Sequence, residues 1–283
     1  MPKIILFIFI LKCSLLSIAQ NTIEGFVFDK NVNPIEFCAV VVVGENIGTY
    51  TNQSGQFYLD LKKQELDSLV FSHVGYHSKK VAINDLLKNK LDTIFLEKGS
   101  ISLKEVEIRP ENNKKIKYKS KREFFGMYSA ISPAIGYIVC YYLNKYSGGI
   151  LTEVSFHFDK VKNTGTYVAL QLLKKDSTPN KEKSLLDTNL VYNLKKDSKK
   201  LTINLSEYFI QIPSDGVLIG LEVLEDPGKK DENAGSLFLR RVDSPSEYLS
   251  CISTWNEKWY WWNQKTRDRD NNLMIDYKVL IPK

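Results

Sequence analysis

The chain has 283 residues, a formal net charge of +6, and a composition that is 43% hydrophobic and 12% aromatic. This apolar content excludes an intrinsically disordered chain, which would have fewer apolar residues and a higher net charge. The length indicates two domains once a processed segment is removed. With three histidines in the whole chain, the catalytic classes that pair a nucleophile with a histidine base have few candidates.

The N-terminus has the order of a secretory signal peptide. Lys3 supplies a positive charge, Ile4–Leu11 is an unbroken apolar run, and Ser17 and Ala19 form a small-x-small site. The apolar run is shorter than the roughly 20 residues of a membrane-spanning helix, and no later segment is long and apolar enough to be one. We therefore expect residues 1–19 to be removed by cleavage after Ala19 and the mature chain to be exported.

The cysteines do not indicate a disulfide framework. Cys13 falls in the signal peptide, where lipidation is disfavoured because Lys12 stands in place of a small residue. The remaining Cys38, Cys140 and Cys251 are odd in number and far apart. Cys38 and Cys140 lie in apolar runs, where cysteine usually behaves as a small buried hydrophobe. A bridge between Cys140 and Cys251 in an oxidising compartment stays open.

The segment 20–108 has the pattern of a β-sandwich, with short β segments separated by turn residues. We expect a hairpin around Asn52–Gly55, with the glycine at a positive-φ position, and a short helical turn at Leu86 and Leu87. The expected strands are Ile23–Phe28, Phe37–Val43, Thr49–Thr51, Phe57–Leu59, Leu69–Ser72, Lys79–Ile83 and Thr93–Leu96.

The same segment carries an ordered set of motifs. These are I-x-G-x-V from Ile23, the valine run after Pro34, Gly48–Asn52 with Gly55-x-Phe57, Phe71-Ser72-x-x-Gly75-Tyr76, and Leu103-x-Glu105-Val106. Together they resemble the carboxypeptidase-like regulatory domain, a transthyretin-like β-sandwich that also forms the N-terminal extension of TonB-dependent outer-membrane receptors. The resemblance implies a fold and an envelope setting but no catalysis, since in metallocarboxypeptidases this domain accompanies a separate zinc domain. The rest of the chain is too short for a receptor barrel of about 22 strands at about 10 residues each.

The basic segment 109–123 reads as a linker. It includes Lys114–Arg122, a run that could bind anionic lipid, acidic glycan or nucleic acid. A solvated linker is the preferred interpretation, and export argues against nucleic acid as a partner.

The β pattern resumes in the segment 124–283, and long connections between many strands indicate a second, jelly-roll-like sandwich. This half resembles carbohydrate-binding and galactose-binding-like jelly rolls in pattern alone. The expected strands are Tyr137–Leu143, Leu151–Phe158, Tyr167–Leu173, Leu190–Leu194, Leu201–Leu205, Val217–Leu224, Leu237–Arg241 and Leu273–Ile281, with a tight turn at Pro213–Gly216.

The residues that could carry chemistry do not form a recognisable catalytic or metal motif. His73 and His77 flank a strand motif, where residues four apart lie roughly 13 Å from each other and cannot chelate one ion. His157 alternates with two phenylalanines, so we expect it on the surface. No G-x-S-x-G motif occurs, and we expect no cofactor, no metal and no enzymatic activity.

The most unusual local feature is an aromatic cluster that holds all four tryptophans of the chain: Trp255, Trp259, Tyr260, Trp261 and Trp262. On a strand, Trp259 and Trp261 would share one face, and Tyr260 and Trp262 the other. One face could fill the core, and the other could be covered by a loop or present rings to a ligand. These five residues are the candidate ligand-binding site.

We therefore expect an all-β, exported and non-catalytic envelope protein, whose C-terminal domain binds a protein or glycan. Two alternatives remain open. One is a glycan-active hydrolase that uses paired carboxylates of the second domain. The other is a structural surface protein that self-associates through sheet edges.

Overall fold

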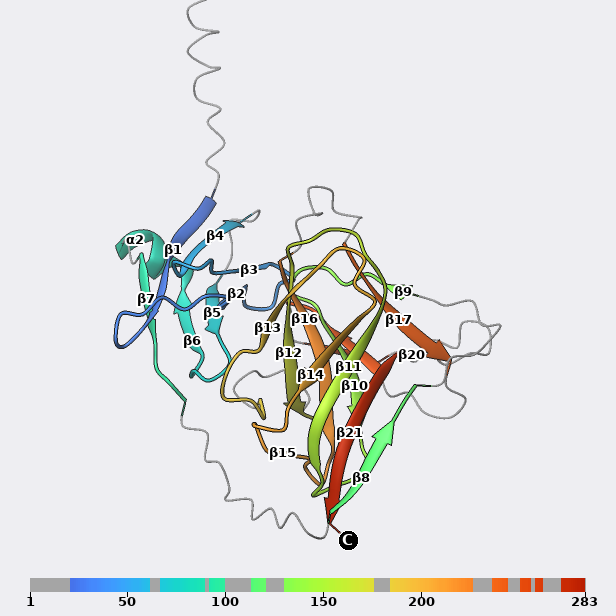
Figure 1. Cartoon of the computed structure of the whole chain (residues 1–283). Coiled ribbons are helices and arrows are strands. Elements are labelled where there is room, and N and C mark those ends of the chain that lie inside the picture. Colours follow the sequence, from blue (N-terminus) through green and yellow to red (C-terminus); the bar gives the residue numbers. More distant parts are fainter. Residues whose placement is uncertain are drawn as a thin grey trace, which may run out of the picture.

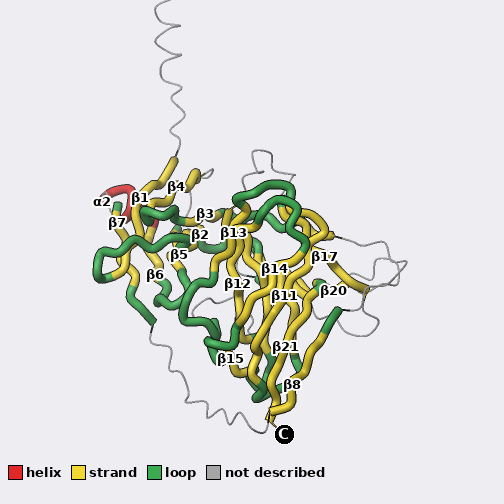
Figure 2. Tube along the Cα trace, in the orientation of Figure 1, coloured by secondary structure: helices red, strands yellow, loops and turns green. Residues whose placement is uncertain are grey.

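The computed structural model of the chain describes residues 21–61, 67–89, 92–99, 113–120, 130–175, 184–225, 236–243, 250–255, 258–261 and 271–282. The predicted signal peptide, 1–19, lies outside these residues. The described part consists of strands joined by loops, together with one short helix (Figure 2), which confirms the all-β prediction. None of its helices is long and apolar enough to cross a membrane. Figure 1 shows two β units lying beside each other, an N-terminal unit (21–99) and a C-terminal unit (113–282).

The N-terminal unit is a sandwich of two small sheets. One sheet has the order β4-β1-β7, the other β3-β2-β5-β6, and the helix α2 (Ile83–Asn89) forms where a helical turn was predicted. Side chains from both sheets, such as Val27, Val40 and Phe71, make one buried core. The strands are β1 (Asn21–Asp29), β2 (Ala39–Val42), β3 (Gly48–Tyr50), β4 (Gln56–Leu61), β5 (Ser68–Ser72), β6 (Lys79–Ala82) and β7 (Thr93–Leu96).

The predicted hairpin around Asn52 is wrong in its pairing, although its turn forms. Asn52 Oδ1 accepts hydrogen bonds from the backbone N–H groups of Ser54 and Gln56, and Gly55 has φ +75°. The strands on either side belong to different sheets, because β3 pairs with β2 and β4 pairs with β1. A turn between adjacent strands is thus used to cross from one sheet to the other.

The C-terminal unit is a larger sandwich of two antiparallel sheets, and the chain crosses between them several times, as in a jelly roll. One sheet has the order β13-β12-β16-β10-β18-β19, and the other runs β20-β17-β11-β21-β8 with β14, β15 and β9 paired at its side. The strands are β8 (Asn113–Tyr118), β9 (Ala130–Ile131), β10 (Ile138–Leu143), β11 (Ile150–Val161), β12 (Thr166–Lys174), β13 (Val191–Leu194), β14 (Lys200–Asn204), β15 (Ile210–Gln211), β16 (Val217–Glu225), β17 (Leu237–Asp243), β18 (Ser250–Ser253), β19 (Trp259–Trp261), β20 (Asn271–Leu273) and β21 (Ile275–Pro282).

The central strand β16 of the six-stranded sheet is buried on both faces. Ile219 and Leu221 belong to the main core, whereas Leu218, next to Ile219 and on the opposite face, belongs to a separate apolar cluster. Eight of the nine residues of β16 are buried, which explains its continuous apolar sequence. The outer face of this sheet therefore needs a cover, and part of that cover is the N-terminal unit.

The segment 109–123, predicted as a linker, is in part a strand. Residues 113–118 form β8 and pair with β21 at the edge of the second sheet. Ile116 is partly buried, while Lys115 and Lys117 point to solvent. Charged side chains are common on edge strands because they discourage pairing with other chains. An edge strand rich in lysine therefore has the same basic composition as a solvated linker, which is why the segment was predicted to be one.

Candidate functional site at the junction of the two units

Trp255 lies between two glycines, one from each unit. A Cβ atom added to Gly48 in the N-terminal unit would lie 2.6 Å from Cε3 of the indole, and one added to Gly136 in the C-terminal unit would overlap the ring. The ring centroid of Trp255 also lies 5.0 Å from that of Tyr50. The absence of a side chain at both glycines allows the indole to pack against both backbones, so Trp255 is a wedge that joins the two units.

A buried polar contact lies next to this wedge. The Tyr50 hydroxyl donates a hydrogen bond to Oε1 of Glu222 on β16, and Gln171 Nε2 donates to Oε2 at 2.7 Å. Glu222 and Gln171 are only 2% and 1% exposed. Burial and the neighbouring Glu222 carboxylate raise the pKa of Tyr50 well above its ordinary value. A carboxylate buried in a sheet is costly unless it is hydrogen-bonded, so the phenol from the other unit stabilises it.

A loop of the N-terminal unit makes the second contact. Val74, between β5 and β6, is 3% exposed and belongs to the main core cluster of the C-terminal unit. His73 Nδ1 lies 2.7 Å from the Val74 carbonyl, and Asn189 Nδ2 lies 3.5 Å from His73 Nε2. Gly75 has φ +85°, and a Cβ there would overlap the Asp187 carbonyl. Val74 and Gly75 thus form a plug that enters the second unit, the Val74 plug, whereas Tyr76 packs on the core of its own unit.

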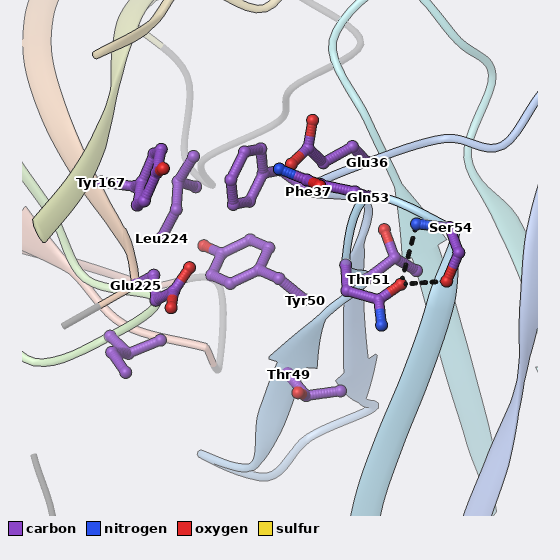
Figure 3. A pocket seen from close by; sticks show the side chains of 12 residues that line it. Glu36, Phe37, Thr49, Tyr50, Thr51, Gln53, Ser54, Tyr167, Leu224 and Glu225 are labelled. Carbon is purple, nitrogen blue, oxygen red and sulfur yellow. Dashed lines mark hydrogen bonds between the residues drawn. The ribbon is translucent and has the colours of Figure 1, made fainter. Parts of the chain in front are cut away.

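Beside the Tyr50 contact the junction opens into a groove of about 660 Å³. Figure 3 shows the Phe37 and Tyr167 rings next to each other in its wall; their centroids are 5.7 Å apart, which is a direct aromatic contact between the two units. Phe37 holds a left-handed backbone conformation (φ 56°), which is uncommon and costly for a bulky residue. We define the junction groove by its twelve lining residues: Glu36, Phe37, Thr49, Tyr50, Thr51, Asn52, Gln53, Ser54, Ile135, Tyr167, Leu224 and Glu225.

Two carboxylates, one from each unit, lie in the junction groove. Partial burial, and to a smaller extent the charge of Glu225, raise the pKa of Glu36 above its ordinary value. Glu225 itself is exposed at the end of β16. With the amides of Asn52 and Gln53, these groups give the groove hydrogen-bonding atoms around an aromatic wall.

A second hollow, of about 620 Å³, lies on the C-terminal unit and corrects the expectation for His157. His157 does face away from the phenylalanine core, but it is 7% exposed rather than on the surface. Its Nε2 lies 2.9 Å from Asp276 Oδ2, which Lys200 Nζ also contacts at 2.9 Å. Side chains of the neighbouring strands, Lys200 on β14 and Asp276 on β21, lie beside the imidazole and bury it, which the alternation of residues along β11 alone does not reveal.

Of the five predicted aromatic residues, Trp255, Trp259 and Tyr260, whose side chains the structure describes, lie in different surroundings. Trp255 is the wedge at the junction, and Trp259 packs on the outer apolar cluster of the six-stranded sheet. Tyr260 is 46% exposed. Trp261 pairs through its backbone with Cys251, and Trp262 lies outside the described residues. Proximity in sequence grouped these residues, but among the three with described side chains only Trp255 contacts a residue of the junction groove, Tyr50.

Sequence reasoning did not identify the other junction residues as site residues. Gly48 and Tyr50 stand in a motif that indicated the fold, and Phe37 begins a predicted strand. The hydroxyl–carboxylate contact joins residues 172 positions apart, and no local pattern carries such a contact. Within the described residues no group of three or more histidine, cysteine or acidic side chains is placed to hold a metal ion.

Two solved structures are similar to the chain over part of their length. The structure of the cysteine protease and lectin-like domains of Cwp84, a surface layer associated protein of Clostridium difficile, is 12% identical, with 92% of this chain and 58% of that chain covered and a TM-score of 0.40. The Streptococcal ancillary pilin is 12% identical, with 79% and 59% covered and a TM-score of 0.21. The chain spans less than two thirds of either, and at these TM-scores neither likeness carries an argument.

No curated protein matches the chain. A family model does match part of it: the CarboxypepD_reg-like domain covers residues 23–108. This match agrees with the motifs of that segment and with its two-sheet sandwich. The N-terminal unit is a CarboxypepD_reg-like domain.

Proposed function

We propose that the protein is an exported, non-catalytic binding module of the cell envelope that holds a glycan chain in the junction groove. The observation that carries this proposal is the composition of the groove. Aromatic rings from both units line one space together with carboxylate and amide side chains. Its volume of about 660 Å³ lies within the usual range for small-molecule sites.

The chemistry of the groove suits a sugar. A pyranose ring offers C–H faces that pack on aromatic side chains such as Phe37 and Tyr167, which bury large areas. Its hydroxyl groups need hydrogen-bond partners. The Gln53 amide can donate and accept, the Asn52 amide nitrogen can donate, and Glu36 and Glu225 can accept. A purely apolar ligand would leave these polar groups unpaired, which lowers affinity.

The buried contacts between the units support a preformed site. Trp255 and the Tyr50–Glu222 hydrogen bond fix Tyr50 in the wall of the groove, and the Val74 plug holds the two units together at a separate point. A site held by buried contacts requires less ordering on binding than a flexible one. The CarboxypepD_reg-like domain would then serve as half of the binding site as well as a rigid support.

Titration calorimetry with a panel of envelope polysaccharide fragments tests this proposal. We expect binding by the full chain and a loss of at least about tenfold in affinity for Tyr167→Ala, corresponding to removal of one stacking ring. Tyr260→Ala, an exposed aromatic outside the groove, is the matched control and should bind normally. Equal binding by all three proteins would refute a groove site.

A glycan hydrolase is the second candidate, because the groove holds two carboxylates and the pKa of Glu36 is raised, as a general acid requires. The pair differs from the expectation of two carboxylates in the second domain, since Glu36 belongs to the first. A reducing-end assay on every fragment that binds decides between the two. Turnover that disappears in both Glu36→Gln and Glu225→Gln would replace the binding proposal with catalysis.

A further inference from the structure

Cys140 and Cys251 lie directly opposite each other on neighbouring strands. They are Cα partners in the antiparallel pairing of β10 with β18. Both side chains are 0% exposed and carry free thiols, and burial, followed by the neighbouring Cys251, raises the pKa of the Cys140 thiol. They belong to the outer apolar cluster of the six-stranded sheet, beside the region that the N-terminal unit covers.

The backbone at this position already suits a disulfide. Opposite residues of an antiparallel pair have Cα atoms about 4.5–5.5 Å apart, and disulfides span Cα distances of about 4.4–6.8 Å. Opposite Cys140 on its other side is Gly220 of β16, where a Cβ atom would overlap the Cys140 sulfur. The sulfur thus lies over Gly220 in the free-thiol form, and a rotation about χ1 brings it to Cys251 when the bridge forms.

We propose that Cys140 and Cys251 form a cross-strand disulfide in the exported protein, and that this bridge fixes the strand that presents Trp255 to the N-terminal unit. β18 ends at Ser253, two residues before the wedge. Linking β18 covalently to the centre of the sheet limits the positions that Trp255 can take between Gly48 and Gly136. The inference shares the exported setting with the proposed function but does not depend on the ligand.

The oxidant is a protein or small-molecule disulfide. The thiolate of one cysteine attacks the oxidant's disulfide, forming a mixed disulfide and releasing one oxidant thiolate. The second cysteine then attacks the first cysteine's sulfur and expels the other oxidant thiolate. In sum, two protons and two electrons pass from the cysteines to the oxidant, which leaves as a dithiol or two thiols. Burial raises the pKa of the Cys140 thiol, and the thiolate is the reactive form, so the exchange takes place during folding, before the strands enclose the sulfurs.

Cys38 provides an internal control. It is buried in the core of the N-terminal unit, where its sulfur lies 3.6 Å from the Ser72 carbonyl. Oxidation that is specific for the cross-strand pair must leave this thiol free.

The experiment is peptide mapping of the full chain purified from an oxidising compartment, and of the same chain refolded with oxidised glutathione. After alkylation in denaturant without reductant, we expect Cys38 to be alkylated and the peptides of Cys140 and Cys251 to be linked. Alkylation of all three cysteines in both samples would overturn the inference, and so would a bridge to Cys38.

A second measurement tests the stabilising role of the bridge. Reductant should lower the urea midpoint of the wild type and of Cys38→Ser, but not that of Cys251→Ser. An equal response of all three proteins contradicts the inference, and if Cys251→Ser does not fold, the peptide map of the wild type decides. Glycan binding is measured on the same samples. A chain in which all three cysteines are alkylated but which still binds glycan contradicts the disulfide inference and leaves the proposed function standing.

Discussion

The closed part and the open part of the junction differ in what fills them. In the closed part, Trp255 occupies the space between two glycines, and Tyr50 satisfies a carboxylate that is 2% exposed. In the open part, Phe37, Tyr167 and two carboxylates surround a hollow. Both parts use aromatic and acidic residues, yet one is packed within the protein and the other leaves space for a ligand. Residue type alone therefore does not separate a structural contact from a binding site.

If the closed part holds the units together, removing its wedge should have the largest effect on stability. We expect Trp255→Ala to lower the free energy of unfolding by about 3 kcal/mol, because a large side chain leaves a cavity between two backbones. Urea unfolding measures this effect. Tyr260→Ala, from the same aromatic cluster but 46% exposed, should stay within about 0.5 kcal/mol of the wild type. Similar costs for both variants would mean that the wedge does not hold the junction.

Removing the carboxylate of the closed part, Glu222, should have the second largest effect on stability. Glu222→Ala leaves the Tyr50 hydroxyl and the Gln171 amide as buried donors without their acceptor, so we expect a loss of about 2 kcal/mol in unfolding free energy. Glu225→Ala, three residues further along the same strand, removes an exposed carboxylate of the open part. It should cost less than about 0.5 kcal/mol. Equal losses of unfolding free energy in the two variants would mean that the closed and open parts contribute alike to stability.

Much of the fold was predictable because its signals are local. Alternation and turn residues predicted most strands of both units, including the turn that contains Gly55 and the turn at Pro213–Gly216. The pairing of β3 and β4 was not predictable in this way, because the choice of sheet depends on contacts far along the chain. The edge strand β8 was not predicted, because a lysine-rich sequence is typical both of a protected sheet edge and of a linker.

The candidate site was less predictable than the fold. Trp255 was identified, but its neighbours in sequence suggested a shared role with Trp259 and Tyr260. Its actual neighbours are Gly48 and Gly136, where the informative property is the absence of a side chain. Which glycines face an aromatic ring is decided by packing between units, and that information appears only in three dimensions.

Alkaline unfolding separates the hydrogen bond of the closed part from its packing. The pKa of Tyr50 is raised in the folded state, so above its ordinary value of 10.0 the unfolded chain loses this proton first. The contribution of Tyr50 is therefore complete below pH 10.0 and is lost as pH rises toward the raised pKa. We expect Tyr50→Phe to lose stability less steeply than the wild type above this pH. Tyr58→Phe, whose ring is 61% exposed, should follow the wild type.

The smallest effect is expected in the open part, where Glu36 is held close to Glu225. Partial burial and the second carboxylate raise the pKa of Glu36 above its ordinary value of 4.5, so the folded state binds this proton more tightly than the unfolded chain. The resulting contribution to stability is complete below pH 4.5 and is lost as pH rises through the raised pKa. At neutral pH, Glu36→Gln removes a charge that folding disfavours. We therefore expect a gain of less than about 0.5 kcal/mol, because solvent screens a partly exposed pair. Paired unfolding curves of variant and wild type between acid and neutral pH measure it, and Glu24→Gln, on the exposed side of β1, is the control. A large loss of stability in Glu36→Gln would show that this carboxylate holds the units together, and that the groove is part of the packed junction rather than space kept for a ligand.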